Sequence, residues 1–516
     1  MTLLAIYSST LDLIKTKNIT MKIKSLVTFP ILLSIFILSC TGQSSSNRPS
    51  TDTSSQKAEQ LDKLISTYTN YDQFNGAVLI SNEGKVIYKK GFGLANMEWD
   101  IPNATDTKHR IASITKQFTA MLILQLAADN KLDLQAPIST YLPNYPKETA
   151  ERVTIHHLLT HTSGIPDYGR FSNYRSFERD RHRPQEIIDL FADLPLESTP
   201  GEEYSYCNSG YVLLGVVIEN ITQKSYADVL QEKILTPLGM VNTGYDYQWP
   251  LLKNRASSYY YTWGQYRNTN YLDMSLPYAA GALYSTVEDL YLWDQALYTE
   301  QLLPQAYLDM MFQKHAATRG RHYGYGWFLG DLPKGSTDEK VASVSHGGGM
   351  DGIRTLITRV PSNKSAIILL SNTENNELRE MTIAINGILY DQPYDLPKKS
   401  IATSLLEVIE KDGTAKGVAF FEAKKNDDGY YIEEQEMVIA GYQLLQKDQA
   451  KEAAVVFELA IQAFPNAFNV YDSYGEALMA LGENAKAIEN YQKSIELNPG
   501  NENGKRKLEE LGVKTE

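Results

Sequence analysis

A serine and a lysine stand three residues apart in the stretch "IASITKQF", at Ser113 and Lys116. If this stretch is helical, the two side chains lie on one face and can meet. A serine hydroxyl becomes a nucleophile when a neighbouring base takes its proton, and a desolvated lysine can be that base. The pair decides little by itself, because Ser54 and Lys57 have the same spacing in a segment that looks unstructured. Ser113 could also cap a helix from which Lys116 reaches solvent.

The residues that follow Lys116 predict a buried helix. They are apolar nearly all round the helix, at Phe118, Met121, Leu122, Ile123, Leu124 and Leu126. A lysine at the N-terminal end of such a helix is partly removed from water. Its pKa is therefore lowered toward the value that a general base needs.

The chain before Ser113 predicts a helix followed by strands. A helix-like stretch begins at about Lys57, with apolar residues at Leu61, Leu64, Ile65 and Tyr68. Two short apolar runs then flank Asn82-Glu83-Gly84, a sequence typical of the turn in a β-hairpin. The order of helix, strands and helical region is typical of an α+β or three-layer domain.

Five further stretches follow Ser113 in order. They are "TIHHLLTHTSGIPDY" (154–168), "YSYCNSGYVLLG" (204–215), "AAGALYSTVEDLYLWDQAL" (279–297), "YGYGWFL" (323–329) and "SHGGGMDG" (345–352). With the Ser-x-x-Lys pair they closely resemble the serine β-lactamase-like family, which includes class C β-lactamases, penicillin-binding carboxypeptidases and related esterases and peptidases. The resemblance covers roughly residues 57–397. The order of the stretches is specific, whereas Tyr-x-Asn alone also occurs at Tyr68 and Tyr266.

The resemblance implies a fold and a catalytic set. The fold is α+β, with an antiparallel sheet covered by helices on both faces and an additional all-helical region. Ser113 would be the nucleophile, Lys116 its base, and Tyr206 a second group acting as phenolate or proton shuttle. Because Lys116 and Tyr206 would influence each other's charge, we expect the pair to titrate as a unit.

The same resemblance implies the substrate-binding residues. Asn208, two residues after Tyr206, would hold a substrate amide carbonyl. The oxyanion would be bound by the backbone N–H groups of Ser113 and Gly349, and the missing side chains of Gly348 and Gly349 allow a ligand to approach closely.

His346 departs from the family pattern, since the third motif reads His-Gly-Gly where many members have Lys-Thr-Gly. A histidine carries a charge only near or below a pKa of about 6.5. Turnover of penicillins and cephalosporins is therefore in doubt, whereas cleavage of peptides, D-amino-acid derivatives or esters is compatible with this residue. A structural role, with His346 capping a strand turn, is the alternative.

Other polar residues near these motifs predict neither a metal nor a cofactor. His157 and His161 are four apart and could share a helical face with His156 nearby, but no glutamate follows His157 and no third ligand is evident. We expect Cys207 to be a small packed side chain, with a redox-sensitive thiol as the alternative. The tyrosine-rich stretch 257–273 could line the substrate cleft or pack as a surface hairpin.

The N-terminal region predicts export and lipidation. Lys22 and Lys24 precede an apolar run from Leu26 to Leu38, too short to span a bilayer, and "ILSC" ending at Cys40 resembles a bacterial lipoprotein box. We expect Cys40 to be lipidated and the polar stretch after it to be a flexible tether, with plain secretion or a retained anchor as alternatives. Met21 could be the true start. The net charge of −13 argues against nucleic acid as a partner, because binding to phosphates needs a basic face.

The C-terminal region carries a 34-residue period. Gly441 and Gly475, Ala453 and Ala487, Phe457 and Tyr491, and Pro465 and Pro499 are each separated by this distance, which resembles tetratricopeptide repeats. A weaker copy would place Ala419 in register with Ala453. The helix pairs would offer a groove for a peptide or protein partner, or would simply pack as a stabilising tail.

These observations predict a lipid-anchored or secreted bacterial envelope protein with two functional parts. The predicted segments are an extension with signal peptide and lipobox (1–40), a tether (41–57), a serine hydrolase domain (58–395), a linker with a degenerate helical repeat (396–435), and tetratricopeptide repeats with a capping helix (436–516). The predicted activity is hydrolysis of an amide or ester through an acyl-Ser113 intermediate. The alternative is a penicillin-binding sensor or scaffold with little turnover, whose repeats recruit a partner.

Overall fold

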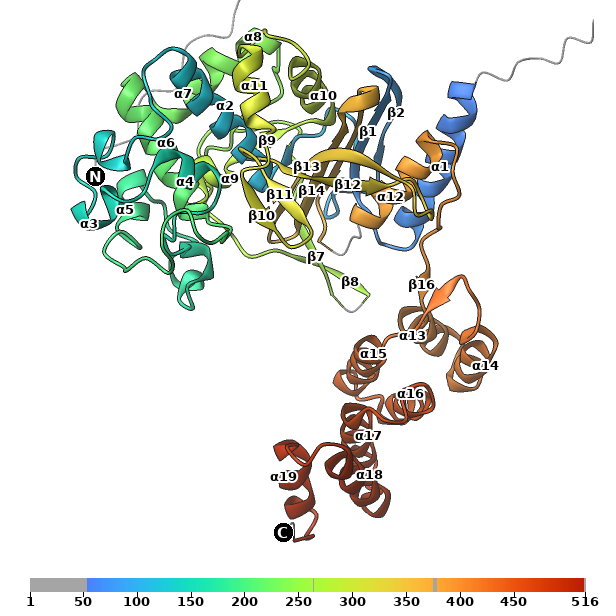
Figure 1. Ribbon diagram of the computed structural model, residues 1–516. Coiled ribbons are helices and arrows are strands. Elements are labelled where there is room, and N and C mark those ends of the chain that lie inside the picture. Colours follow the sequence, from blue (N-terminus) through green and yellow to red (C-terminus); the bar gives the residue numbers. More distant parts are fainter. Residues whose placement is uncertain (1–52, 263, 375–377, 515–516) are drawn as a thin grey trace, which may run out of the picture. The chain divides into compact units, whose positions relative to one another are not determined.

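The computed structural model describes residues 53–262, 264–374 and 378–514 (Figure 1). The predicted lipid-attachment site, Cys40, lies outside these ranges. Helix α1 (Thr53–Asn70) begins earlier than the predicted start at about Lys57, so the segment predicted to be unstructured is helical there. The Lys57 ammonium donates to the Leu389 carbonyl and to the Asp391 carboxylate, which commits this second Ser-x-x-Lys lysine to a structural role.

An eight-stranded sheet forms the centre of the first part, with every neighbouring pair of strands antiparallel. In spatial order the strands are β10 (Ala316–Thr318), β11 (Arg321–Tyr323), β12 (Phe328–Pro333), β13 (Lys340–Met350), β14 (Ile353–Val360), β15 (Ser365–Ser371), β1 (Gly76–Asn82) and β2 (Lys85–Phe92). The predicted hairpin is confirmed. Its turn has φ of 52° at Glu83 and 72° at Gly84, as a two-residue hairpin turn requires.

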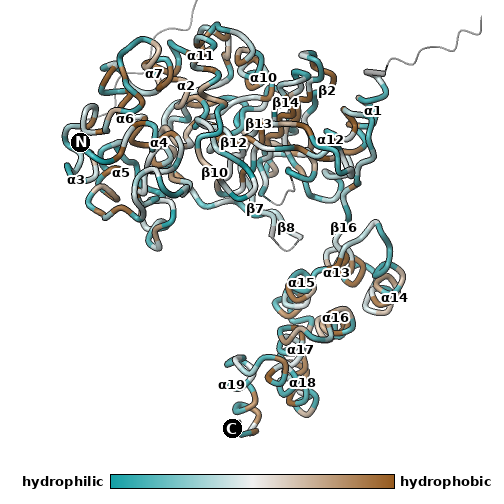
Figure 2. The backbone as a smooth tube through the Cα atoms, in the orientation of Figure 1, coloured by the Kyte–Doolittle hydropathy of each residue, from teal (hydrophilic) through white to brown (hydrophobic). Residues whose placement is uncertain are grey.

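Helices cover both faces of this sheet. Alternate residues of β1 point to opposite faces. Val78 and Ile80 pack with helices α1 and α12 (Leu378–Leu389). Ala77 and Leu79 instead join the larger core that contains α2 (Thr115–Ala128) and α10 (Val287–Ala296). Figure 2 shows hydrophobic residues along the central strands, which are buried on both sides. The predicted α+β three-layer fold is confirmed.

The all-helical region positions the motifs around helix α2. The prediction that this helix is buried is confirmed, because Phe118, Met121, Ile123 and Leu124 are inaccessible to solvent. Helices α4 (Ile155–Leu159), α6 (Asn208–Thr222) and α9 (Tyr278–Gly281) share its core. Helix α4 ends before His161, so His157 and His161 do not lie on one helical face as the spacing had suggested.

The tyrosine-rich stretch packs as a hairpin of β7 (Tyr259–Thr262) and β8 (Gln265–Asn268). The hydroxyls of Tyr261 and Tyr266 both donate to the Asp72 carboxylate. These two tyrosines therefore follow the packing alternative rather than lining a substrate cleft.

The C-terminal part consists of helices, and the 34-residue period is visible in their bounds. After α13 (Ile401–Asp412) and α14 (Thr414–Lys424) come α15 (Glu434–Gln446), α16 (Ala450–Ala463), α17 (Phe468–Ala480), α18 (Asn484–Leu497) and α19 (Glu502–Glu510). A Cβ atom added at Gly441 would lie 2.3 Å from the Phe457 ring, and one at Gly475 would lie 2.8 Å from the Tyr491 ring. The glycines are thus needed for close helix packing in each repeat.

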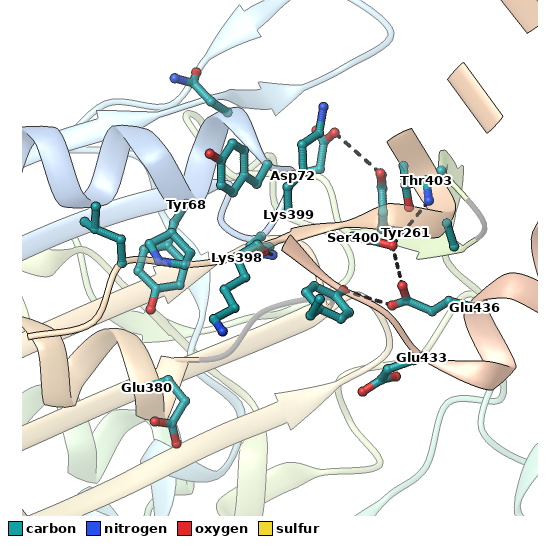
Figure 3. Close-up of a pocket in the computed structure, with 18 of the residues that line it drawn as sticks. Tyr68, Asp72, Tyr261, Glu380, Lys398, Lys399, Ser400, Thr403, Glu433 and Glu436 are labelled. Atoms are coloured by element: carbon teal, nitrogen blue, oxygen red, sulfur yellow. Dashed lines mark hydrogen bonds between the residues drawn. The ribbon is translucent and has the colours of Figure 1, made fainter. Parts of the chain in front are cut away.

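The weaker repeat copy is a helix pair, α13 and α14, but its predicted register is wrong. Ala419 is exposed, whereas Ala453 and Ala487 are fully buried. Ser400 caps helix α13 and donates to Glu436 of α15 (Figure 3). The Glu436 carboxylate also accepts from the Tyr431 hydroxyl. Across the described ranges, no helix is long and apolar enough to cross a membrane.

Candidate functional site

Ser113 lies in a strained turn that leads into helix α2. It is the middle residue of a short 3₁₀ helix (Ala112–Ile114), and Ala112 has a φ of 46°, in the left-handed region that non-glycine residues rarely adopt. Thr355 of β14 donates its hydroxyl to the Ile111 carbonyl, 3.1 Å away. Strain of this kind persists only where the surroundings hold it, and it is common at functional sites.

Gly348 brings the third motif against this turn. A Cβ atom at Gly348 would lie 2.2 Å from the Ile111 carbonyl oxygen, so only glycine fits there. At Gly349 the nearest atom to such a Cβ would be 3.4 Å away, on Arg354, which is an ordinary contact. Gly348 is therefore required for the approach of β13 to the Ser113 turn, while Gly349 is not sterically restricted.

Lys116 is fully buried beside Ser113. Its Nζ atom donates to Ser113 Oγ (3.1 Å), to Asn208 Oδ1 (2.8 Å) and to the Ala280 carbonyl (2.9 Å). The ammonium group also lies 4.9 Å from the centre of the Tyr206 ring. These contacts bring together the first two predicted motifs around one nitrogen atom.

Burial has opposite effects on the two titratable groups next to Ser113. It lowers the pKa of Lys116 to about 7, although the negative charge of Asp167 partly opposes the shift. It raises the pKa of Tyr206 well above its usual value, although a hydrogen bond with Ser113 partly opposes that shift. At neutral pH the lysine can therefore be unprotonated, while the tyrosine stays a neutral phenol.

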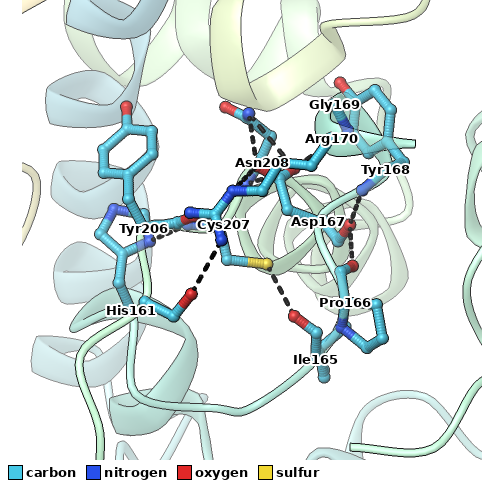
Figure 4. Close-up of polar contacts among 12 residues, drawn as sticks. His161, Ile165, Pro166, Asp167, Tyr168, Gly169, Arg170, Tyr206, Cys207 and Asn208 are labelled. Atoms are coloured by element: carbon cyan, nitrogen blue, oxygen red, sulfur yellow. Dashed lines mark hydrogen bonds and ion pairs between the residues drawn. The ribbon is translucent and has the colours of Figure 1, made fainter. Parts of the chain in front are cut away.

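Asp167 and Arg170 hold the second motif in place (Figure 4). The buried Asp167 carboxylate accepts from the backbone N–H of Asn208 (3.2 Å) and from its side-chain amide (3.3 Å). Arg170 lies 3.7 Å from Asp167 and donates to the Tyr206 carbonyl (2.7 Å). With its amide nitrogen at Asp167, Asn208 presents its oxygen to Lys116.

His161 supports the same motif from the opposite side. Its Nδ1 atom accepts from the backbone N–H of Cys207 (3.0 Å), and its ring centre is 4.3 Å from that of Tyr206 (Figure 4). The Cys207 thiol is buried and donates to the Ile165 carbonyl, and burial raises its pKa to about 12. These contacts agree with a packed Cys207. No group of residues in the described ranges has the composition of a metal site.

His346 is a neutral residue within the wall of the site. Both of its ring nitrogens are engaged, Nε2 accepting from the Tyr323 hydroxyl (3.1 Å) and Nδ1 donating to the Gly347 carbonyl (2.7 Å). Burial lowers its pKa to about 3, and the charge of Lys116 adds to this effect. His346 therefore does not supply the fixed positive charge of a third-motif lysine.

Sequence reasoning missed the residues that position these motifs. Asp167 and His161 both occur in the quoted stretch 154–168, but nothing in the stretch indicates which motif they contact. The contact that Gly326 makes, in the quoted stretch 323–329, was also not predicted. A φ of 77° at Gly326 and a Cβ distance of 2.9 Å to the Lys116 carbonyl show that the "YGYGWFL" turn packs directly on helix α2.

Comparisons with known proteins agree with this arrangement. The family model described as Beta-lactamase matches residues 61–389, and that described as Tetratricopeptide repeat matches residues 468–501. The chain is 33% identical over 398 residues to penicillin-binding protein 4* of Bacillus subtilis, covering 70% of this chain and 85% of the relative.

Solved structures show the same fold. The octameric penicillin-binding protein homologue of Pyrococcus abyssi has 27% identity and a TM-score of 0.57, with 68% of this chain and 81% of that chain covered. D-amino acid amidase from Ochrobactrum anthropi SV3 has 24% identity and a TM-score of 0.55, with 66% of this chain and 98% of that chain covered. By its fold, its family match and this close relative, the chain belongs to the β-lactamase family, with a tetratricopeptide repeat in its C-terminal part.

Proposed function

We propose that the chain is a serine hydrolase that cleaves an amide or ester bond through an acyl-Ser113 intermediate. The observation that carries this proposal is the buried Lys116 amine, 3.1 Å from Ser113 Oγ and with a pKa of about 7. An unprotonated amine at this distance can take the hydroxyl proton as Oγ attacks a carbonyl carbon. No second acid or base has to be invoked for that step.

The remaining steps can be assigned to neighbouring groups. Backbone N–H groups of Ser113 and Gly349 would bind the oxyanion, and the second hydrogen of the Asn208 amide can donate to a substrate carbonyl. Collapse of the intermediate breaks the bond to the leaving group, which receives a proton through the neutral Tyr206 hydroxyl. Water then attacks the acyl ester, releases the acid and returns the proton to Ser113.

The substrate class that fits this site is a peptide, a D-amino-acid derivative or an ester. The names of the relatives, a penicillin-binding protein and a D-amino acid amidase, support this range. A neutral His346 in place of lysine favours hydrolysis of these substrates over turnover of β-lactams.

The helical repeats would recruit a protein partner, in line with the repeat match at residues 468–501.

Three substrates test the proposal on one preparation: a nitrophenyl ester, a D-amino-acid amide and a penicillin. Steady release of product from the ester or the amide is expected. A single stoichiometric burst on all three, with no later turnover, would instead favour the sensor or scaffold alternative. No product from any of them, and no acylated protein, would contradict the proposed chemistry.

The pH dependence of the reaction should follow Lys116. Below a pH of about 7 the amine is protonated and cannot accept the Ser113 proton, so kcat/KM should fall about tenfold per pH unit there and level off above. His346 is neutral across this range and should add no further step. The measurement is kcat/KM for a neutral ester between about pH 5 and 8.5. A flat profile would contradict a catalytic lysine.

Asp167→Asn should slow the reaction and shift its pH profile. The variant loses a carboxylate that orients Asn208, so kcat/KM should fall about 10- to 100-fold. It also loses the charge that favours protonated Lys116, so the midpoint of the acid limb should move to lower pH. The exposed Asp309→Asn variant is the matched control. If the melting temperature changes while kcat/KM and the pH profile stay those of the wild type, Asp167 stabilises the fold and does not position the catalytic groups.

Lipid anchoring through Cys40 is proposed together with an envelope location. A Cys40→Ser variant expressed in a bacterium should move from the membrane fraction to the soluble fraction, because the thiol that carries the lipid is missing. Cys207→Ser is the matched control and should leave the distribution unchanged. An unchanged distribution of the Cys40 variant would contradict the anchor.

A further inference from the structure

A cavity of about 1120 Å³ borders the candidate site and is strongly basic. Tyr206 and His346 form part of its wall. Its charged lining residues in the described ranges are five cations and one carboxylate, namely Lys314, Arg319, Arg321, Lys340, Arg379 and Asp331. The whole chain has a net charge of −13. A local excess of positive charge in an acidic protein therefore borders the candidate site at Tyr206 and His346.

Four of the five cations form no ion pair with a carboxylate in the part of the chain that the structure describes. Arg379 is paired with Glu380 (3.0 Å), but Lys314, Arg319, Arg321 and Lys340 form no ion pair within the described ranges. All five cations are exposed, so water and salt screen their mutual repulsion, and an anionic ligand that binds among them gains from their combined attraction.

Arg321 is exposed but makes two contacts within the wall of the cavity. Its side chain lies across strand β12, where a Cβ atom at Gly330 would be only 2.9 Å from Arg321 Cγ. Its guanidinium group lies 4.5 Å from the centre of the Phe328 ring. A guanidinium held over an aromatic ring is partly preorganised, so less entropy is lost when it binds a ligand.

Phe328 links Arg321 to the third motif. The centre of its ring is 5.2 Å from that of His346, which is in turn 6.2 Å from that of Tyr206. His346 itself offers no free ring N–H and no charge, because both nitrogens are bonded within the protein. The basic cavity therefore offers positive charge next to His346, which supplies none itself.

We propose that this cavity is a subsite for a negatively charged group of the substrate, a carboxylate or a phosphate, and that Arg321 is its specificity-determining residue. The inference rests on the proposed hydrolase function and narrows its substrate class. The guanidinium can donate two parallel hydrogen bonds to either anion. Arg379 and Arg319 also line the cavity and add to the attraction.

The test compares three esters with the same acyl group and the same scissile bond. The leaving group is neutral in the first, carries a carboxylate in the second and carries a phosphate in the third. The intact protein should prefer at least one anionic ester by about tenfold in kcat/KM at low salt, mainly through KM. The preference should weaken as the salt concentration rises. The two anionic arms identify which group the site accepts.

Arg321→Gln should remove this preference and leave kcat/KM for the neutral ester unchanged. Arg321→Lys keeps the charge without the planar fork and should retain part of the preference. Arg152→Gln, at an exposed arginine outside the cavity, is the matched control and should keep the whole preference. Melting temperatures show that each variant is folded.

Two results would overturn the inference. A wild-type protein that hydrolyses all three esters equally, or a preference that survives in Arg321→Gln, would exclude this subsite while leaving the hydrolase intact. Failure to hydrolyse even the neutral ester, with no acylation of Ser113, would refute the proposed function on which the subsite rests.

Discussion

Ser113→Ala is expected to abolish hydrolysis of every ester or amide that the wild-type protein turns over. A loss of at least about 10⁴-fold in kcat is expected, since removing a serine nucleophile leaves only binding and oxyanion stabilisation. Ser113 Oγ is the only hydroxyl among the described residues that receives a hydrogen bond from Lys116 Nζ. Loss of that oxygen removes the atom that would carry the acyl group.

The chain provides a matched control in its second Ser-x-x-Lys sequence. Ser54 also stands three residues before a lysine, Lys57. That lysine is bound to Leu389 and Asp391, so Ser54→Ala should remove no catalytic group. The Ser54→Ala variant should be as active as the wild type when both are measured by progress curves of ester or amide hydrolysis. If Ser113→Ala retained more than a few per cent of the wild-type rate, the nucleophile would have to be another residue.

Lys116→Met should produce the second large effect, a loss of activity together with a gain in stability. Methionine fills much of the same volume but cannot take a proton, so kcat should fall by about 10³-fold or more. Lys116 is fully buried, and the depressed pKa indicates that its charge is unfavourable there. Removing an unfavourable buried charge should raise the melting temperature.

The sign of the stability effect depends on pH. The folded-state pKa of Lys116 is about 7, below the value of 10.5 expected in the unfolded chain. Below pH 7 the wild type bears the whole cost of burying the charge. As pH rises from 7 towards 10.5 the unfolded state binds more protons than the folded state, so this cost diminishes.

The melting-temperature difference between Lys116→Met and the wild type should therefore be largest near pH 6 and should narrow above pH 7. Thermal unfolding monitored by circular dichroism at several pH values provides the measurement. A variant less stable than the wild type at pH 6 would mean that the three hydrogen bonds of Lys116 outweigh the cost of its burial.

Much of the fold could be predicted from local pattern. The apolar residues all round helix α2 are enough to predict a buried helix. The sequence Asn82-Glu83-Gly84 is likewise enough to predict the hairpin turn. The glycines at positions 441 and 475 reveal the repeat because each must accommodate an aromatic ring 16 residues later. Ala419 shows the limit of periodicity, since a matching residue type at the right distance is exposed there.

The candidate site was only partly predictable, because its residues meet through long-range packing. The order of motifs pointed to Ser113, Lys116 and Tyr206, but not to Asp167, whose neighbour Asn208 is 41 residues away. The charge on Lys116 and the neutrality of His346 depend on burial, which no local pattern reveals. That Arg321 forms no ion pair with a described carboxylate likewise appears only when the strands are assembled.

Intact-mass spectrometry after treatment with a fluorophosphonate tests the central claim most directly. The reagent phosphonylates activated serine hydroxyls with loss of fluoride, and Lys116 would supply the activation. We expect one adduct per wild-type molecule, none on Ser113→Ala, and a modified peptide that contains Ser113. An unmodified wild-type protein, or an adduct that persists in Ser113→Ala, would contradict the assignment of Ser113 as the nucleophile.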